Sequence, residues 1–139
     1  MAAPTRRQVL LGAGAGAGLV VLTACSSGGA PSGARTTAPP IPPGTDLAAV
    51  ADVPVGGGLA VTVGKAPVLV SQPAEGELLA FDATCTHERC PVEVDDDEFR
   101  CPCHQSRYDL ATGEVLGGPA PRPLTPIPVV VQDGRVVTT

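Results

Sequence analysis

The sequence has little that would support nucleic-acid binding or a membrane span. It has no Trp and only three aromatic residues, Phe81, Phe99 and Tyr108, and its formal net charge is −5. An acidic chain with so few aromatic rings lacks both the cations that bind phosphates and the rings that stack on bases, so nucleic acid is excluded as a partner. No apolar run reaches the roughly 18–20 residues that a membrane span needs.

Residues 1–24 have the features of an export signal. Arg6 and Arg7 precede a weakly apolar stretch, residues 9–22, which is as long as the apolar part of a signal peptide. The adjacent arginines resemble a twin-arginine export signal. The following Leu-Thr-Ala-Cys resembles a lipoprotein box, which implies that Cys25 is lipidated and becomes the mature N-terminus. An ordinary signal cleaved after Cys25 and an uncleaved anchor are the alternatives.

A polar tether follows the signal. Of the 21 residues from 26 to 46, 15 are Gly, Pro, Ser or Thr. Such a stretch cannot bury enough apolar surface to offset the entropy of ordering it. We therefore expect residues 25–46 to link the lipidated cysteine to a domain over residues 47–139. These features predict an exported protein, held by its lipid at the extracytoplasmic face of the cell membrane.

Residues 47–139 have the pattern of an all-β domain. They contain ten Pro and show no sustained helical periodicity. Gly-containing turns separate short apolar runs, as is typical of strands. These runs cover residues 60–63, 68–70, 78–81, 129–131 and 136–137. We expect a small antiparallel sandwich or barrel around one small core.

Candidate metal ligands gather between residues 84 and 108. The chain has two histidines, and each lies close to a cysteine, in Cys85-x-His87 and Cys101-x-x-His104. Two further cysteines, Cys90 and Cys103, lie one in each segment. Thiolate and imidazole ligands suit zinc as well as iron. The spacing alone therefore predicts a Cys₂His₂ metal site, and a redox-silent zinc site remains an alternative.

The two segments resemble the cluster-binding loops of the Rieske iron–sulfur family. The likeness lies in Cys85-Thr86-His87-x-x-Cys90 and in Cys101-Pro102-Cys103-His104-x-Ser106-x-Tyr108. Residues 118–121, together with Leu124, resemble the proline-rich loop that covers the cluster in that family. The resemblance implies a Rieske-type β-domain over residues 47–139. Its inserted cluster-binding subdomain would use loops 84–91 and 101–108 and the proline loop 117–124.

The resemblance also implies a cofactor and a role for each site residue. A Rieske centre is one [2Fe–2S] cluster in which two histidines replace two cysteines on one iron. By likeness, Cys85 and Cys101 hold one iron, and His87 and His104 hold the other. A Cys90–Cys103 disulfide would join the loops. Hydroxyl groups of Ser106 and Tyr108 would donate hydrogen bonds to sulfur, which stabilises the reduced cluster and implies a high potential.

We therefore expect one-electron transfer at the outer face of a bacterial cytoplasmic membrane. The partner would be an unidentified redox protein or a membrane quinol oxidoreductase. One alternative is the Rieske subunit of a quinol-oxidising cytochrome bc-type complex. Many quinol-oxidising relatives, however, carry an apolar residue and a glycine where this chain has Glu88 and Arg89, and a charged pair is costly to bury against an apolar quinol pocket.

Two other enzyme classes fit the residues poorly. A thiol–disulfide oxidoreductase would have to use Cys90 and Cys103, but the chain has no Cys-x-x-Cys at the start of a helix. A Rieske oxygenase needs two further histidines for a mononuclear iron, and this chain has none to spare.

Five of the six residues from 93 to 98 are acidic. We expect a solvated hairpin tip between the two loops. The alternative is a docking patch for a basic redox partner.

Overall fold

The computed structural model describes residues 41–139, which form an antiparallel β-structure. Within that range the only helical element is a single 3₁₀ turn, η1 (Val50–Asp52). The expected all-β, antiparallel fold class is thus confirmed. No helix in the described range is long and apolar enough to cross a membrane.

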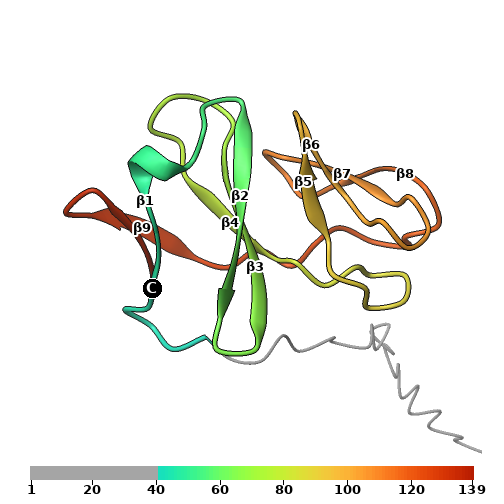
Figure 1. The fold of residues 1–139 in the computed structure, drawn as a ribbon, viewed down its shortest axis with the longest axis horizontal. Coiled ribbons are helices and arrows are strands. Elements are labelled where there is room, and N and C mark those ends of the chain that lie inside the picture. Colours follow the sequence, from blue (N-terminus) through green and yellow to red (C-terminus); the bar gives the residue numbers. More distant parts are fainter. Residues whose placement is uncertain (1–40) are drawn as a thin grey trace, which may run out of the picture. The chain divides into compact units, whose positions relative to one another are not determined.

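The strands lie in three sheets (Figure 1). The first sheet has the order β1-β10-β9, formed by β1 (Asp46–Ala49), β10 (Arg135–Thr138) and β9 (Val129–Gln132). The second has the order β2-β3-β4, formed by β2 (Gly57–Val63), β3 (Ala66–Gln72) and β4 (Leu79–Asp82). The third has the order β5-β6-β7-β8, formed by β5 (Glu93–Asp95), β6 (Glu98–Arg100), β7 (Arg107–Asp109) and β8 (Val115–Gly117).

Strand β3 is buried on both faces and separates two apolar clusters. Val68 and Val70 point to a cluster that includes Val136 of the first sheet. Leu69, between them, points to a second cluster that includes Phe81 and Phe99. Alternate residues of a strand face opposite sides, so a continuous apolar run fits a strand with a core on each side. The expectation of one small core is therefore wrong.

The β5–β6 hairpin brings together the two segments that form the site. Because β5 and β6 are antiparallel neighbours, the segment before β5 and the segment after β6 meet at the same end of that hairpin. The segment after β8 returns alongside β4, where the Asp82 amide donates to the Thr125 carbonyl at 2.8 Å and the Ile127 amide donates to the Ala80 carbonyl at 2.8 Å. Residues 117–124 are thus fixed at both ends.

Candidate metal centre

Two loops with equivalent backbone hydrogen bonds form the site. Loop 1 (residues 84–91) precedes β5, and loop 2 (residues 101–106) follows β6. The hydrogen bonds that close them run from Cys85 N to Cys90 O (2.8 Å), Arg89 N to Cys85 O (2.9 Å), Cys101 N to Ser106 O (2.8 Å) and Gln105 N to Cys101 O (3.0 Å). Cys85 and Cys101 therefore occupy the same place in the two loops. The second loop is shorter than the sequence predicted, because Tyr108 lies in β7.

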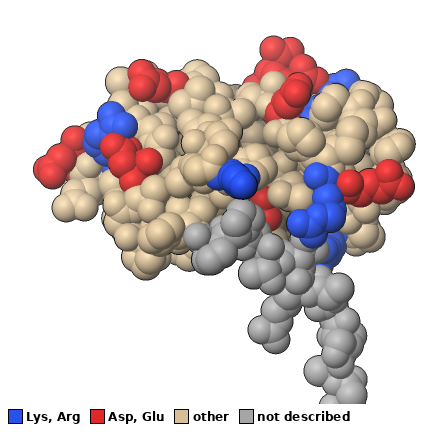
Figure 2. Space-filling model, turned by 60° about the horizontal axis from the view of Figure 1, so that its bottom comes forward, with Lys and Arg blue, Asp and Glu red and all other residues tan. Residues whose placement is uncertain are grey.

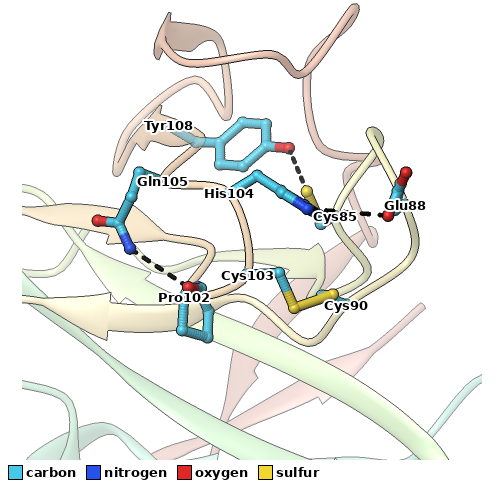
Figure 3. Close-up of a disulfide and its surroundings, with 8 residues drawn as sticks. All are labelled: Cys85, Glu88, Cys90, Pro102, Cys103, His104, Gln105 and Tyr108. Atoms are coloured by element: carbon cyan, nitrogen blue, oxygen red, sulfur yellow. Dashed lines mark hydrogen bonds and ion pairs between the residues drawn. A yellow bond between two sulfur atoms is a disulfide. The ribbon is translucent and has the colours of Figure 1, made fainter.

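A disulfide joins the loops. Cys90 and Cys103 are bonded, with their Cα atoms 6.5 Å apart (Figure 3). The Sγ atoms of Cys90, Cys101 and Cys103 lie within 4.8 Å of one another. Two of these three sulfurs are bonded to each other and offer no thiolate to a metal. The free thiols of the described range are Cys85 and Cys101, and both are buried.

The two thiols and the two imidazoles lie at different depths. Cys85 and Cys101 are 2% and 1% exposed and belong to the apolar cluster under the loops. The imidazole rings of His87 and His104 contact each other edge to face, with centroids 4.8 Å apart and planes at 87°. The side chain of His104 is 47% exposed. A metal group held by these four residues would have sulfur ligands on its buried side and imidazoles on its outer side.

Two buried polar atoms fit a group between the loops. His87 Nδ1 and Ser106 Oγ are buried and have no hydrogen-bond partner among the residues that the structure describes. A buried polar atom without a partner costs about 1–3 kcal/mol, so such atoms call for an explanation. A metal bound to His87 Nδ1, and a sulfur that accepts from Ser106 Oγ, would satisfy both. The residues present thus fit a [2Fe–2S] cluster.

The two thiols differ in acidity. Burial opposes ionisation of Cys85, but hydrogen bonds from the Tyr108 hydroxyl and the His87 amide outweigh it, so its pKa lies below the ordinary value. Burial raises the pKa of Cys101, and the neighbouring Cys85 adds to this shift. Without a cation between them, two adjacent sulfurs resist carrying two negative charges. Positive iron would remove that conflict and bind both as thiolates.

Tyr108 supports the buried side of the site. Its side chain is fully buried, and its hydroxyl lies 3.3 Å from the Sγ of Cys85 (Figure 3). The Thr86 amide donates to the same hydroxyl at 3.3 Å. Burial, followed by the nearby Cys85 sulfur, raises the pKa of Tyr108, so the phenol keeps its proton. Tyr108 is therefore placed to donate a hydrogen bond to the sulfur of Cys85.

The proline loop (residues 117–124) packs directly on loop 2. Gly118 has φ +88°, and a Cβ added there would lie 2.6 Å from the Cα of Ser106. Only glycine permits so close an approach of two backbones. The Thr86 hydroxyl donates to the Arg122 carbonyl at 2.7 Å, which fastens the same segment to loop 1. Sequence reasoning missed this role of Thr86, since no local pattern links it to a residue 36 positions away.

A carboxylate lies beside the outer histidine. Glu88 Oε2 is 4.0 Å from His104 Nε2, and the two side chains point toward each other (Figure 3). Both are exposed, Glu88 to 63%. The sequence singled out Glu88 as a charged residue of the first loop but gave no sign that it faces His104, because the two residues belong to different loops.

Two of the five acidic residues at 93–98, Asp95 and Glu98, are paired with neighbouring arginines. Arg100 contacts Asp95 at 2.6 Å and Glu98 at 2.9 Å, and Arg107 contacts Glu98 at 2.8 Å. The hydrogen bond from Arg107 is the main reason that the pKa of Glu98 lies below its ordinary value. Asp96, with φ 53°, forms the turn between β5 and β6 together with Asp97. This part of the chain is thus a hairpin tip, as expected.

The predictions for residues 1–40 lie outside the described residues. They concern the export signal, the lipidation of Cys25 and most of the tether. The described range begins within the predicted tether, and Thr45 is already bound to β10, through a hydrogen bond from its amide to the Thr138 hydroxyl at 2.9 Å.

Comparison with known proteins gives one family. Residues 45–130 match the family model described as Rieske [2Fe-2S] domain. The cytochrome b6-f complex iron-sulfur subunit of Chlorobaculum tepidum is 37% identical over 90 residues, which are 63% of this chain and 49% of the relative. The chain thus spans about half the length of that relative.

A second group of relatives is shorter. The ferredoxin component of the naphthalene 1,2-dioxygenase system of Pseudomonas aeruginosa is 34% identical over 95 residues, which are 66% of this chain and 90% of the relative. Among solved structures, the plasma membrane Rieske protein PetC3 of Synechocystis PCC 6803 is similar with a TM-score of 0.60 and 31% identity, covering 68% of this chain and 98% of that one.

Proposed function

Because the chain belongs to the Rieske [2Fe-2S] domain family, we propose that Cys85 and Cys101 hold one iron of its single cluster and that His87 and His104 hold the other. The protein is a Rieske-type electron-transfer protein. The observation that carries the ligand assignment is the presence in two paired loops of two buried free thiols and two imidazoles in contact, with His87 Nδ1 buried and without a hydrogen-bond partner among residues 41–139.

The residues around the site would bury one side of the cluster and expose the other, as one-electron transfer to a partner requires. A [2Fe–2S] cluster supplies a site that takes up and releases one electron. The buried thiols exclude water from its inner side. The exposed imidazole of His104 gives a short path between the cluster and a partner at the surface. The disulfide and the proline loop hold both loops in place around it.

The proposal predicts the metal content of two variants. The full chain, purified without oxygen, should contain two iron atoms and two acid-labile sulfides and should give a Rieske-type electron paramagnetic resonance signal when reduced. Cys85→Ser should lose the cluster. Cys25→Ser removes a cysteine outside the site and should keep it. A protein with one zinc and no iron would instead support a structural Cys₂His₂ site.

We also propose that the centre has a high potential. The support is the Tyr108 hydroxyl 3.3 Å from the Cys85 sulfur and the buried hydroxyl of Ser106, which has no hydrogen-bond partner in the described range. Hydrogen bonds to sulfur stabilise the reduced state, which carries more negative charge. Tyr108→Phe and Ser106→Ala should each lower the midpoint potential by about 40 mV for a net hydrogen bond of about 1 kcal/mol. An unchanged potential in both variants would refute this role.

Export and anchoring form a further proposal. The arginine pair and Cys25 in its lipoprotein-like box support an exported protein held by lipid at the outer face of a bacterial cytoplasmic membrane. Mass spectrometry of the mature protein should find a lipidated Cys25 at the N-terminus. Cys25→Ser should release the cluster-containing protein from membranes. A mature chain that begins after Cys25 would contradict the anchor.

The relatives suggest two kinds of partner. A cytochrome b6-f subunit is one relative, and a dioxygenase ferredoxin is the other. We propose a separate redox protein as the partner of this chain, because exposed Glu88 and Arg89 would be costly to bury in an apolar quinol pocket. If the protein were isolated from native membranes as a stable subunit of a quinol-oxidising complex, it would instead be the Rieske subunit of a cytochrome bc-type complex.

A further inference from the structure

Three cysteine sulfurs converge between the two loops. The Sγ atoms of Cys90, Cys101 and Cys103 lie within 4.8 Å of one another. In residues 41–139, no other three Cys, His, Asp or Glu side chains bring their ligand atoms this close together. On the face drawn in Figure 2, in contrast, acidic side chains lie at several separate places. These sulfurs are therefore the densest set of metal-ligating atoms in the described domain.

The spacing of the three sulfurs suits a zinc ion once the disulfide is reduced. Zinc–sulfur bonds are about 2.3 Å long, so two sulfurs of a tetrahedral zinc site lie roughly 3.8 Å apart. The Cys101 sulfur lies at most 4.8 Å from those of Cys90 and Cys103. Reduction frees Cys90 and Cys103 from each other, so rotation of the three side chains is enough to bring their sulfurs around one ion.

The surroundings of Cys101 favour a metal-bound thiolate. The backbone amides of Cys103 and His104 donate hydrogen bonds to its Sγ, and amide groups directed at one atom stabilise negative charge there. Cys101 is 1% exposed, and a charge buried to that degree needs a cation beside it. Cys103 is exposed, so an ion from solvent reaches the set from that side.

We propose that the reduced chain binds one zinc ion through Cys90, Cys101 and Cys103, with water in the fourth position. This site goes beyond the proposed electron transfer. It uses neither Cys85 nor the histidines, so it also differs from a Cys₂His₂ zinc site. Zinc and the proposed cluster exclude each other, because each needs Cys101.

The disulfide would decide whether the zinc site exists. A dithiol reductant gives two electrons and two protons to the Cys90–Cys103 disulfide, which becomes two thiols, while the reductant becomes a disulfide. Thiols stay reduced in the bacterial cytosol, and disulfides form outside it. Under the export proposed above, zinc and the cluster would compete for Cys101 before export. Formation of the disulfide would then remove two of the three zinc ligands.

Two variants with equal numbers of thiols test the proposal. Both also carry Cys25→Ser, which removes the one cysteine outside the loops. Both are freed of metal with a chelator and reduced with a phosphine, which becomes its oxide with oxygen from water as the S–S bond becomes two thiols. Cys85→Ser keeps the three converging thiols. Cys101→Ser also keeps three thiols, but one of them, Cys85, lies outside the converging set.

Reduced Cys85→Ser should bind one zinc ion at least about tenfold more tightly than reduced Cys101→Ser. X-ray absorption should find three sulfur ligands at about 2.3 Å from the zinc. Equal affinities would mean that any three loop thiols suffice, as in an unfolded chain, and would overturn the proposal. One sulfur and two histidine nitrogens around the zinc would overturn it as well.

Re-formation of the disulfide gives a second readout. Oxidised glutathione takes two electrons from Cys90 and Cys103 and becomes two glutathione thiols. In zinc-loaded Cys85→Ser this oxidation should release the ion and weaken zinc binding at least about 100-fold, because two ligands are lost. Zinc that stays bound after the disulfide has formed would contradict the proposal.

The wild type separates this proposal from the proposed function. Without zinc, the reduced chain should take up iron and sulfide, and one equivalent of zinc should block that uptake until a chelator removes it. Uptake at the same rate with zinc bound would show that the two groups do not share Cys101. A wild type that takes up no cluster even without zinc would mean that the proposed function fails, while the zinc titrations of the two variants still decide the zinc site.

Discussion

The two halves of the described domain are held together by different interactions. The sheets β1-β10-β9 and β2-β3-β4 enclose a cluster built mainly from Val, Ala and Leu. The sheet β5-β6-β7-β8 has strands of three residues each. Its loops depend on a disulfide, side-chain hydrogen bonds and arginine–carboxylate pairs. Burial of aliphatic side chains thus stabilises the scaffold, whereas the site combines an apolar cluster of its own, which includes Phe99 and Tyr108, with specific bonds that position the loops.

Removal of the disulfide should produce the largest difference in stability between the two halves. Cys90→Ala/Cys103→Ala opens a crosslink between residues 13 positions apart and should cost about 3 kcal/mol on the chain-entropy model. Hydrogen exchange should show the loss of protection in loops 1 and 2, with β2, β3 and β4 still protected. Val70→Ala, in the scaffold cluster, is the opposite variant and should loosen β2–β4. If each variant instead lost hydrogen-exchange protection equally in both halves, the two halves would unfold as one unit.

Two glycines with similar backbones give a matched pair, one in each half. Gly118→Ala places a Cβ 2.6 Å from the Ser106 backbone, whereas Gly134→Ala, also at positive φ, meets nothing within 4 Å. Gly118→Ala should therefore cost about 2 kcal/mol more, because the proline loop must move. Thermal unfolding measures the cost. In Gly118→Ala alone, the absorbance of the cluster should also bleach faster. Equal unfolding temperatures and bleaching rates in the two variants would show that Gly118 does not pack closely on the Ser106 backbone.

The ion pairs of β6 and β7 predict a pH dependence. Arg107 lowers the pKa of Glu98 below the ordinary 4.5, so Glu98 adds stability that is fully present above pH 4.5 and is lost as the pH falls through its lower folded value. Glu98→Gln should be about 1.5 kcal/mol less stable at pH 7. That difference should shrink below pH 4.5 in urea unfolding experiments. A difference independent of pH would show that side-chain packing, not charge, is responsible.

The smallest effect concerns backbone strain in loop 2. Gln105 has φ 59°, which glycine adopts freely. Gln105→Gly should raise the free energy of unfolding by about 1 kcal/mol, and Gln132→Gly, in strand β9, should lower it. Urea unfolding compares the two. Destabilisation by Gln105→Gly would show that its side-chain hydrogen bond to the Pro102 carbonyl, at 3.2 Å, outweighs the strain.

The difference between the two halves also explains which strands could be predicted from the sequence. The five apolar runs correspond to β2, β3, β4, β9 and β10. Val68, Leu69 and Val70 of β3 are buried, whereas Val130 and Val131 of β9 are exposed and reflect the strand preference of β-branched residues. The strands of the third sheet are too short to show a period, and β1 pairs with β10 at the far end of the chain. Register there depends on cross-strand neighbours such as Phe99 and Tyr108.

The site shows a similar division. The cysteines and histidines could be selected because their residue types carry the chemistry at a recognisable spacing. Contacts between distant segments could not be found in this way. Thr86 binds the proline loop, Glu88 faces His104, and Arg107 pairs with Glu98 only because the folded sheets bring them together.

Nitrogen electron–nuclear double resonance on the reduced protein tests the central assignment most directly. If His87 and His104 bind one iron, the spectrum should show two inequivalent histidine nitrogens coupled to the cluster, and His104→Cys should leave one. A spectrum without coupled nitrogen, in a protein that contains two iron atoms and two sulfides, would show that cysteines alone hold the cluster and would contradict the account.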